Sequence, residues 1–194
     1  TEIPSGTGPC TDGTYDIETN TTIGNVKIGC NLRIAKNSTV VTLTGPVWVE
    51  GNIIFEQGPE IRVSPLQGRF SVQMIADNQS NRTTSSKVDI GNSTEFTGSG
   101  HSSSFVMVLS MNNSGELGGA EKAMTIGQST AGALIAYAGH GIVDIANQIA
   151  LKSVTGYRID IGNNSSVTYD SGLANTLFTG GPGGGYEIAD WYQE

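Results

Sequence analysis

Five copies of one phrase recur along this chain, each built on an isoleucine followed by a small residue and, in most copies, by Asn or Gln. The copies occupy residues 33–38, 88–93, 124–129, 143–148 and 159–164. Ile126, Ile145 and Ile161 are 19 and 16 residues apart, and we interpret the 36-residue step from Ile90 to Ile126 as two units. A degenerate period of 16–20 residues is typical of a solenoid.

Short triplets with two apolar residues around an exposed middle one fill the chain between these phrases, as in Val26-Lys27-Ile28 and Val47-Trp48-Val49. This alternation is β-strand periodicity, and Gly, Asn or Pro separates many of the triplets. We therefore predict an all-β protein, a single right-handed parallel β-helix over residues 21–177 with roughly nine rungs of about 16–20 residues. The Ala-rich run 131–138 is predicted to be a strand, because glycines interrupt it.

Both ends of the chain differ from this pattern. Residues 1–20 are expected to form an N-terminal extension tethered by a disulfide between Cys10 and Cys30, with two free buried thiols as the alternative. Residues 178–194 read as a Gly-rich linker and an aromatic C-terminal strand, which would cover the last rung. A docking peptide for a partner is the alternative for this tail.

Composition and cysteine content limit the function classes. A net charge of −8 without a basic patch argues against nucleic-acid binding. Paired cysteines indicate an oxidising, exported environment, so we expect an extracellular, cell-surface location. The chain shows no signal peptide or transmembrane run, and membrane attachment would need a segment outside this sequence.

Asp89, Asp144 and Asp160 precede recurring isoleucines and are predicted to form one outward column. Asp144 and Asp160 are one repeat apart, so they should stack at the strand spacing of about 4.8 Å. Arg158 and Lys87 lie two residues before Asp160 and Asp89, so a charge ladder explains the column without a ligand. Calcium is the functional alternative, although no Asp-rich loop supplies its roughly six to eight oxygen ligands. No other metal, cofactor or catalytic residue is predicted.

Function is expected where the repeat is interrupted or exposes aromatic side chains. Polar loops are predicted at 77–86 and 112–122, and Trp48 should point outward. Together with Trp191 and Tyr192 of the tail, Trp48 is a candidate contact surface. A polysaccharide-cleaving β-helix would need a cleft with several acids. An ice-binding face would need an outward Thr column, for which only Thr42 and Thr125 fit.

The two ends of the chain also resemble a known group of proteins. The residues Tyr15-Asp16-Ile17, then 47–53 with Val47-Trp48-Val49, and the ending 169–191 are similar to exported, pilus-assembly-associated (minor-pilin-like) β-solenoid ectodomains of ultra-small bacteria. The rung size resembles bactofilin-type β-helices. This resemblance implies a non-enzymatic cell-surface or pilus-associated structural or adhesion module, with surface or pilus subunits or cell-surface glycans as partners. A polysaccharide-binding or polysaccharide-cleaving β-helix is the alternative.

Overall fold

The computed structural model describes residues 1–35, 38–168 and 177–178, and these residues contain no α-helix. Short strands form nearly all of the regular structure, together with two 3-10 turns, η1 (Gly8–Cys10) and η2 (Pro65–Gln67). The strands are β1 (Glu2–Ile3), β2 (Thr14–Ile17), β3 (Thr21–Ile23), β4 (Val26–Ile28), β5 (Asn31–Ile34), β6 (Val40–Leu43), β7 (Val47–Val49), β8 (Ile53–Phe55), β9 (Glu60–Val63), β10 (Phe70–Ala76), β11 (Val88–Ile90), β12 (Glu95–Thr97), β13 (Val106–Ser110), β14 (Lys122–Ile126), β15 (Ala131–Gly132), β16 (Leu134–Ile145), β17 (Ala150–Leu151), β18 (Ser153–Ile161), β19 (Ser166–Val167) and β20 (Leu177–Phe178).

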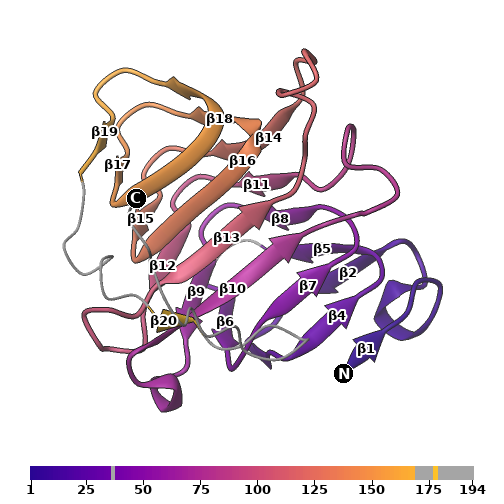
Figure 1. Ribbon diagram of the computed structural model, residues 1–194. Helices are drawn as coiled ribbons and strands as arrows, with labels where there is room; N and C mark the ends of the chain where they lie inside the picture. The colour runs from indigo at the N-terminus through magenta and orange to yellow at the C-terminus, as the bar shows by residue number, and fades with distance from the viewer. Residues whose placement is uncertain (36–37, 169–176, 179–194) are drawn as a thin grey trace, which may run out of the picture.

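All the described strand pairs are parallel, and from β1 to β13 each strand pairs with the third strand after it, which confirms the predicted β-solenoid (Figure 1). We call β1, β4, β7, β10, β13 and the first halves of β16 and β18 the first face. The second face consists of β2, β5, β8, β11, β14 and the second halves of β16 and β18. The third face consists of β3, β6, β9, β12 and β15. The right-handed sense of the coil stays a prediction, supported by the handedness of parallel crossovers.

The rungs are fewer and less regular than predicted. Seven rungs can be traced in the described residues, because each of the first two faces has seven strand segments. Ile90 pairs directly with Ile126, so the 36-residue step is one rung and not two. Its extra length lies largely in the loop between β13 and β14. Ile145 pairs with Ile161, and that rung spans only 16 residues.

The core is a set of stacked inward columns, as the alternation of the triplets predicts. The two apolar ends of strands such as β4, β7 and β8 are buried, and the middle residue is half-buried. Phe55 packs edge-on against Phe96 across the interior, with ring centroids 5.6 Å apart. One inward column contains the isoleucine of every repeated phrase together with Ile17 and Phe55: Ile17, Ile34, Phe55, Ile90, Ile126, Ile145 and Ile161.

Side-chain amides join successive rungs at the corners. Asn92 Oδ1 accepts a hydrogen bond from the backbone N–H of Gln128 (2.8 Å), and Asn147 Oδ1 accepts one from Asn163 (2.7 Å). The left-handed conformation falls on the residue after each amide, for example Ser93 with φ of 59°. The Asn side chain of the phrase therefore joins its rung to the next one by a hydrogen bond, and the residue after it makes the turn. Asn37, the amide residue of the first phrase, lies outside the described residues.

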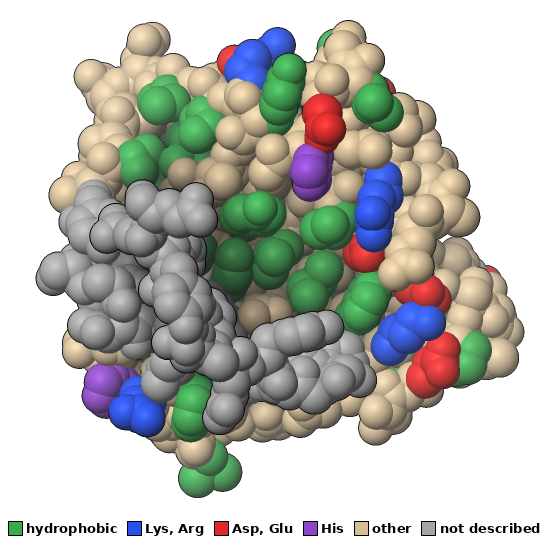
Figure 2. All heavy atoms as spheres, viewed as in Figure 1, with side chains coloured by type: hydrophobic (Ala, Val, Ile, Leu, Met, Phe, Trp, Pro, Cys, Tyr) green, Lys and Arg blue, Asp and Glu red, His purple; other side chains and the backbone are tan. Residues whose placement is uncertain are grey.

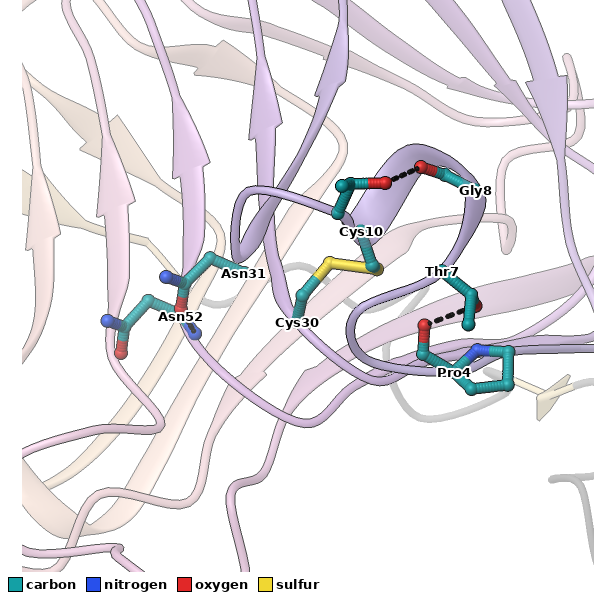
Figure 3. The surroundings of a disulfide bond; sticks show 8 residues. Pro4, Thr7, Gly8, Cys10, Cys30, Asn31 and Asn52 are labelled. Atoms are coloured by element: carbon teal, nitrogen blue, oxygen red, sulfur yellow. Dashed lines mark hydrogen bonds between the residues drawn. A yellow bond between two sulfur atoms is a disulfide. The ribbon is translucent and has the colours of Figure 1, made fainter.

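The N-terminal residues belong to the first rung of the solenoid, although a separate extension was expected there. β1 pairs with β4, and β2 pairs with β5. The predicted disulfide joins Cys10 in η1 to Cys30 between β4 and β5, with a Cα–Cα distance of 5.7 Å (Figure 3). Both cysteines are buried, so the bridge fixes the η1 loop to the second rung.

The C-terminal strand β20 pairs with β10 in the fourth rung, where Leu177 lies opposite Phe70. The predicted aromatic strand over the last rung falls in residues 179–194, which lie outside the described residues. The predicted loops at 77–86 and 112–122 are present between β10 and β11 and between β13 and β14. Both emerge at the corner between the first and second faces.

Candidate functional site

The predicted aspartate column runs along the outside of the second face. Asp89 pairs with Thr125, Thr125 with Asp144, and Asp144 with Asp160, one residue per rung. The same column continues toward the N-terminus through Ile54, Arg33 and Asp16. The sequence carried a signal for this extension, because Asp16 and Arg33 directly precede Ile17 and Ile34.

Basic side chains neutralise the C-terminal half of this column. Lys122 Nζ lies 2.8 Å from Asp160 Oδ2 and 3.4 Å from Asp144 Oδ2, so one ammonium bridges both carboxylates. Arg158 adds bonds of 3.1 Å to Asp160. The hydrogen bonds from Lys122 and Arg158 hold the pKa of Asp160 below its ordinary value. The bond to Asp160 raises the pKa of Lys122.

The N-terminal half of the column is neutralised in the same way. Arg33 makes a two-pronged contact with Asp16, through Nε to Oδ1 (2.7 Å) and Nη2 to Oδ2 (2.9 Å). Its third nitrogen lies 3.2 Å from Glu56 Oε1. The hydrogen bond from Arg33 lowers the pKa of Asp16. The column is therefore organised as a charge ladder on the outer surface of the second face.

Asp89 differs from the other aspartates because its carboxylate accepts a hydrogen bond from the Thr125 hydroxyl, and Lys87 pairs with Glu121 instead (3.0 Å). Open hollows of about 340 and 320 Å³ adjoin it. They are lined by mixed charges and backbone, including Lys122 and Asp144. Among the residues with described positions, no three His, Cys, Asp or Glu side chains gather as a metal site. The ion pairs of Arg33 and Lys122 with the aspartates support the charge-ladder interpretation of the column.

An apolar surface that the sequence only partly indicated lies on the outside of the first face. Trp48 pairs with Ile75, Ile75 with Leu109, and Leu109 with Tyr137, so the four side chains form one outward column over four rungs. Met107 and Ile135 form a parallel column beside it. We call these six residues the first-face patch. Figure 2 shows apolar side chains gathered in a hollow over β10, β13 and β16.

The chemistry of the first-face patch is that of a contact surface. Five of its side chains are half-buried, and Ile135 is buried. Among the described residues, the buried indole N–H of Trp48 has no hydrogen-bond partner, which is costly unless a ligand or water supplies one. The outward position predicted for Trp48 is found. Trp191 and Tyr192, the other predicted contact residues, lie outside the described residues.

The two long loops pack against each other beside the patch. Asn112, which is fully buried, donates through Nδ2 to the carbonyl oxygens of Thr83 (3.1 Å) and Ser85 (2.8 Å). Arg82 holds Asp77 through bonds of 2.7 and 3.0 Å. The loops therefore form one braced unit. Sequence reasoning could not find this contact, because it joins segments about one rung apart through polar residues.

Thr42 and Thr125, the two residues considered for an ice-binding column, lie on different faces. Thr42 is on the third face, between Thr22 and Arg62, and Thr125 is on the second. The described residues thus do not align these two threonines in a single column.

Comparison of the chain with protein-family models, with curated proteins and with solved structures finds no match. The function must therefore be argued from the surfaces of the solenoid. No helix in the described ranges is long and apolar enough to cross a membrane.

Proposed function

We propose that this protein is a non-enzymatic structural or adhesion module of the cell surface, associated with a pilus or with surface subunits, and that it binds its partner through the first-face patch. The observation that supports this most is the alignment of Trp48, Ile75, Leu109 and Tyr137 on four successive rungs. Contiguous apolar surface on a soluble scaffold marks an interaction site.

The scaffold suits such a role because a solenoid presents its outward columns at fixed spacing. The buried Cys10–Cys30 disulfide hints at an oxidising location outside the cytoplasm. Aromatic side chains with a polar tip, such as Tyr137 and Trp48, are typical of interface centres. These features support adhesion to a surface protein or a glycan.

The alternative is a polysaccharide-binding or polysaccharide-cleaving β-helix. The aromatic rings of Trp48 and Tyr137 favour the binding form of this alternative, since sugar rings pack on aromatic faces. Glycoside cleavage needs a carboxylic acid that keeps its proton near neutral pH. Asp160 does not suit that role, because its ion pairs lower its pKa.

A glycan-array and whole-cell binding screen with the oxidised protein tests the proposal. Leu109→Thr with Tyr137→Thr should weaken binding at least tenfold, because both substitutions remove apolar area from the centre of the patch. Ile54→Thr is the matched control, since Ile54 is also a half-buried outward aliphatic residue but lies on the second face. Binding to neither glycans nor cells, or equal loss in the control, would refute the proposal.

A further inference from the structure

The two ends of the solenoid are finished differently. At the N-terminal end, Cys10 of the η1 loop is buried and disulfide-bonded to the second rung, and Ile17 is only 2% exposed. At the other end, Ile161 occupies the equivalent inward position and is 57% exposed. Tyr157 (60%) and Val167 (42%) are exposed on the same rung. The C-terminal end therefore presents core positions of the solenoid to solvent.

β18 forms an edge at this end that is long for this fold. It has nine residues and turns the corner from the first face to the second, and within the described residues it pairs only with β16. Its outer backbone groups are therefore a template for one more strand. In soluble proteins such an edge is normally covered or paired.

The sequence of β18 is complementary to itself in one antiparallel register. When Ile159 lies opposite Ile159 of a second copy, Arg158 lies opposite Asp160, and Asp160 opposite Arg158. Tyr157 then lies opposite Ile161. Opposite-charge and apolar cross-strand pairs stabilise antiparallel strands. The side chain of Arg158 is 56% exposed and that of Asp160 is 40% exposed, so both can reach a neighbouring strand.

We propose that a second copy of this chain docks on the C-terminal end of the solenoid through antiparallel pairing of the two β18 strands about Ile159. The arrangement has a two-fold axis, so each copy uses the same surface. It would place Tyr157, Ile159 and Ile161 of both copies over the open end. The covered N-terminal end would stay free, so the assembly would stop at a dimer. This inference is independent of what the first-face patch binds.

Light scattering after size-exclusion chromatography over a concentration series tests the inference. The protein should elute with twice the 20.2 kDa mass of one chain. Arg158→Asp makes both charged positions acidic, and Asp160→Arg makes both basic, so each variant alone should elute with the mass of one chain. A 1:1 mixture of the two variants should recover the double mass, because every pair across the axis is again opposite in charge.

Arg62→Asp on the third face is the matched control and should keep the double mass, since Arg62 lies away from β18. Circular dichroism of each variant shows that it is folded, and recovery in the mixture shows the same for both. A wild-type protein that stays at the single-chain mass would overturn the inference, because the end then needs no second copy to cover it. Dimeric single variants, or a mixture that does not recover the double mass, would overturn the proposed register.

Discussion

Outward side chains on this solenoid are stacked one per rung, so a residue interacts with residues about 16 to 36 positions away rather than with its sequence neighbours. Like charges stacked in this way repel each other at strand spacing. The second face avoids the repulsion by placing a cation at each crowded step. Arg33 lies beside Asp16, and Lys122 bridges Asp144 and Asp160. These pairs are exposed, so each contributes little to overall stability.

The Asp16–Arg33 pair leads to a pH-dependent prediction. The pKa of Asp16 is lowered in the folded state, so its contribution is present above the ordinary carboxyl pKa and is lost as pH falls through the folded value. Arg33→Gln should raise the pKa of Asp16 toward its ordinary value. The difference in stability between this variant and the wild type should shrink in acid.

Carboxyl NMR titration of Asp16 measures this pKa directly, and urea unfolding at several pH values measures the stability difference. Arg62→Gln is the control, because Arg62 donates to Thr42 and not to Asp16. An unchanged Asp16 pKa in the Arg33 variant would contradict the assignment.

Strands and loops play separate parts at the level of elements. Each strand supplies inward core residues at alternate positions, while the corners absorb differences in rung length. The two long loops absorb the most, and buried Asn112 ties them together. A buried amide with satisfied hydrogen bonds gives a loop pair one arrangement, whereas an unsatisfied carbonyl is costly.

Replacing Asn112 tests whether the loops are braced in this way. Asn112→Ala removes the donor to the carbonyl oxygens of Thr83 and Ser85 and should cost about 1–3 kcal/mol. Faster amide exchange should be confined to residues 77–87 and 111–121. Asn113→Ala is the control, because its side chain makes only a 3.5 Å contact with Thr83. Equal effects of the two substitutions would show that the bracing lies elsewhere.

The whole molecule is an asymmetric rod of rungs, covered at its beginning and open in its last described rung. The disulfide closes a loop between positions 10 and 30, which restricts the unfolded chain and fixes the η1 loop to the second rung. Stability in a solenoid is shared between neighbouring rungs. Loss of the disulfide at the N-terminal end should therefore destabilise the first rung most and the following rungs progressively less.

Removal of the disulfide tests this view. Cys10→Ala with Cys30→Ala should lower the free energy of unfolding by about 2–5 kcal/mol. Amide exchange should increase first in β1 to β5 and last in β13 to β16. Reduction of the wild type with dithiothreitol should give the same result. Uniform exchange along the whole chain would show that the N-terminal end does not protect the rungs beneath it.

The alternation of the triplets and the repeated isoleucine were enough to predict the fold class, the inward column and the outward Asp144–Asp160 step. The pairing of the cysteines was also predictable, because the chain has two of them. Rung number was not predictable, because the separation of Ile90 and Ile126 does not distinguish one long rung from two short ones. The extension of the charge ladder to Asp16 was available in the sequence and was missed.

The sequence by itself determined that this chain is a parallel β-solenoid, because strand alternation and a repeated core residue are local properties. Only the tertiary structure decided which outward residues share a column, since loops of different length shift the count between rungs. The first-face patch shows this most clearly. Trp48, Ile75, Leu109 and Tyr137 are 27 to 34 residues apart, with no common motif, and backbone hydrogen bonding between rungs alone brings them together.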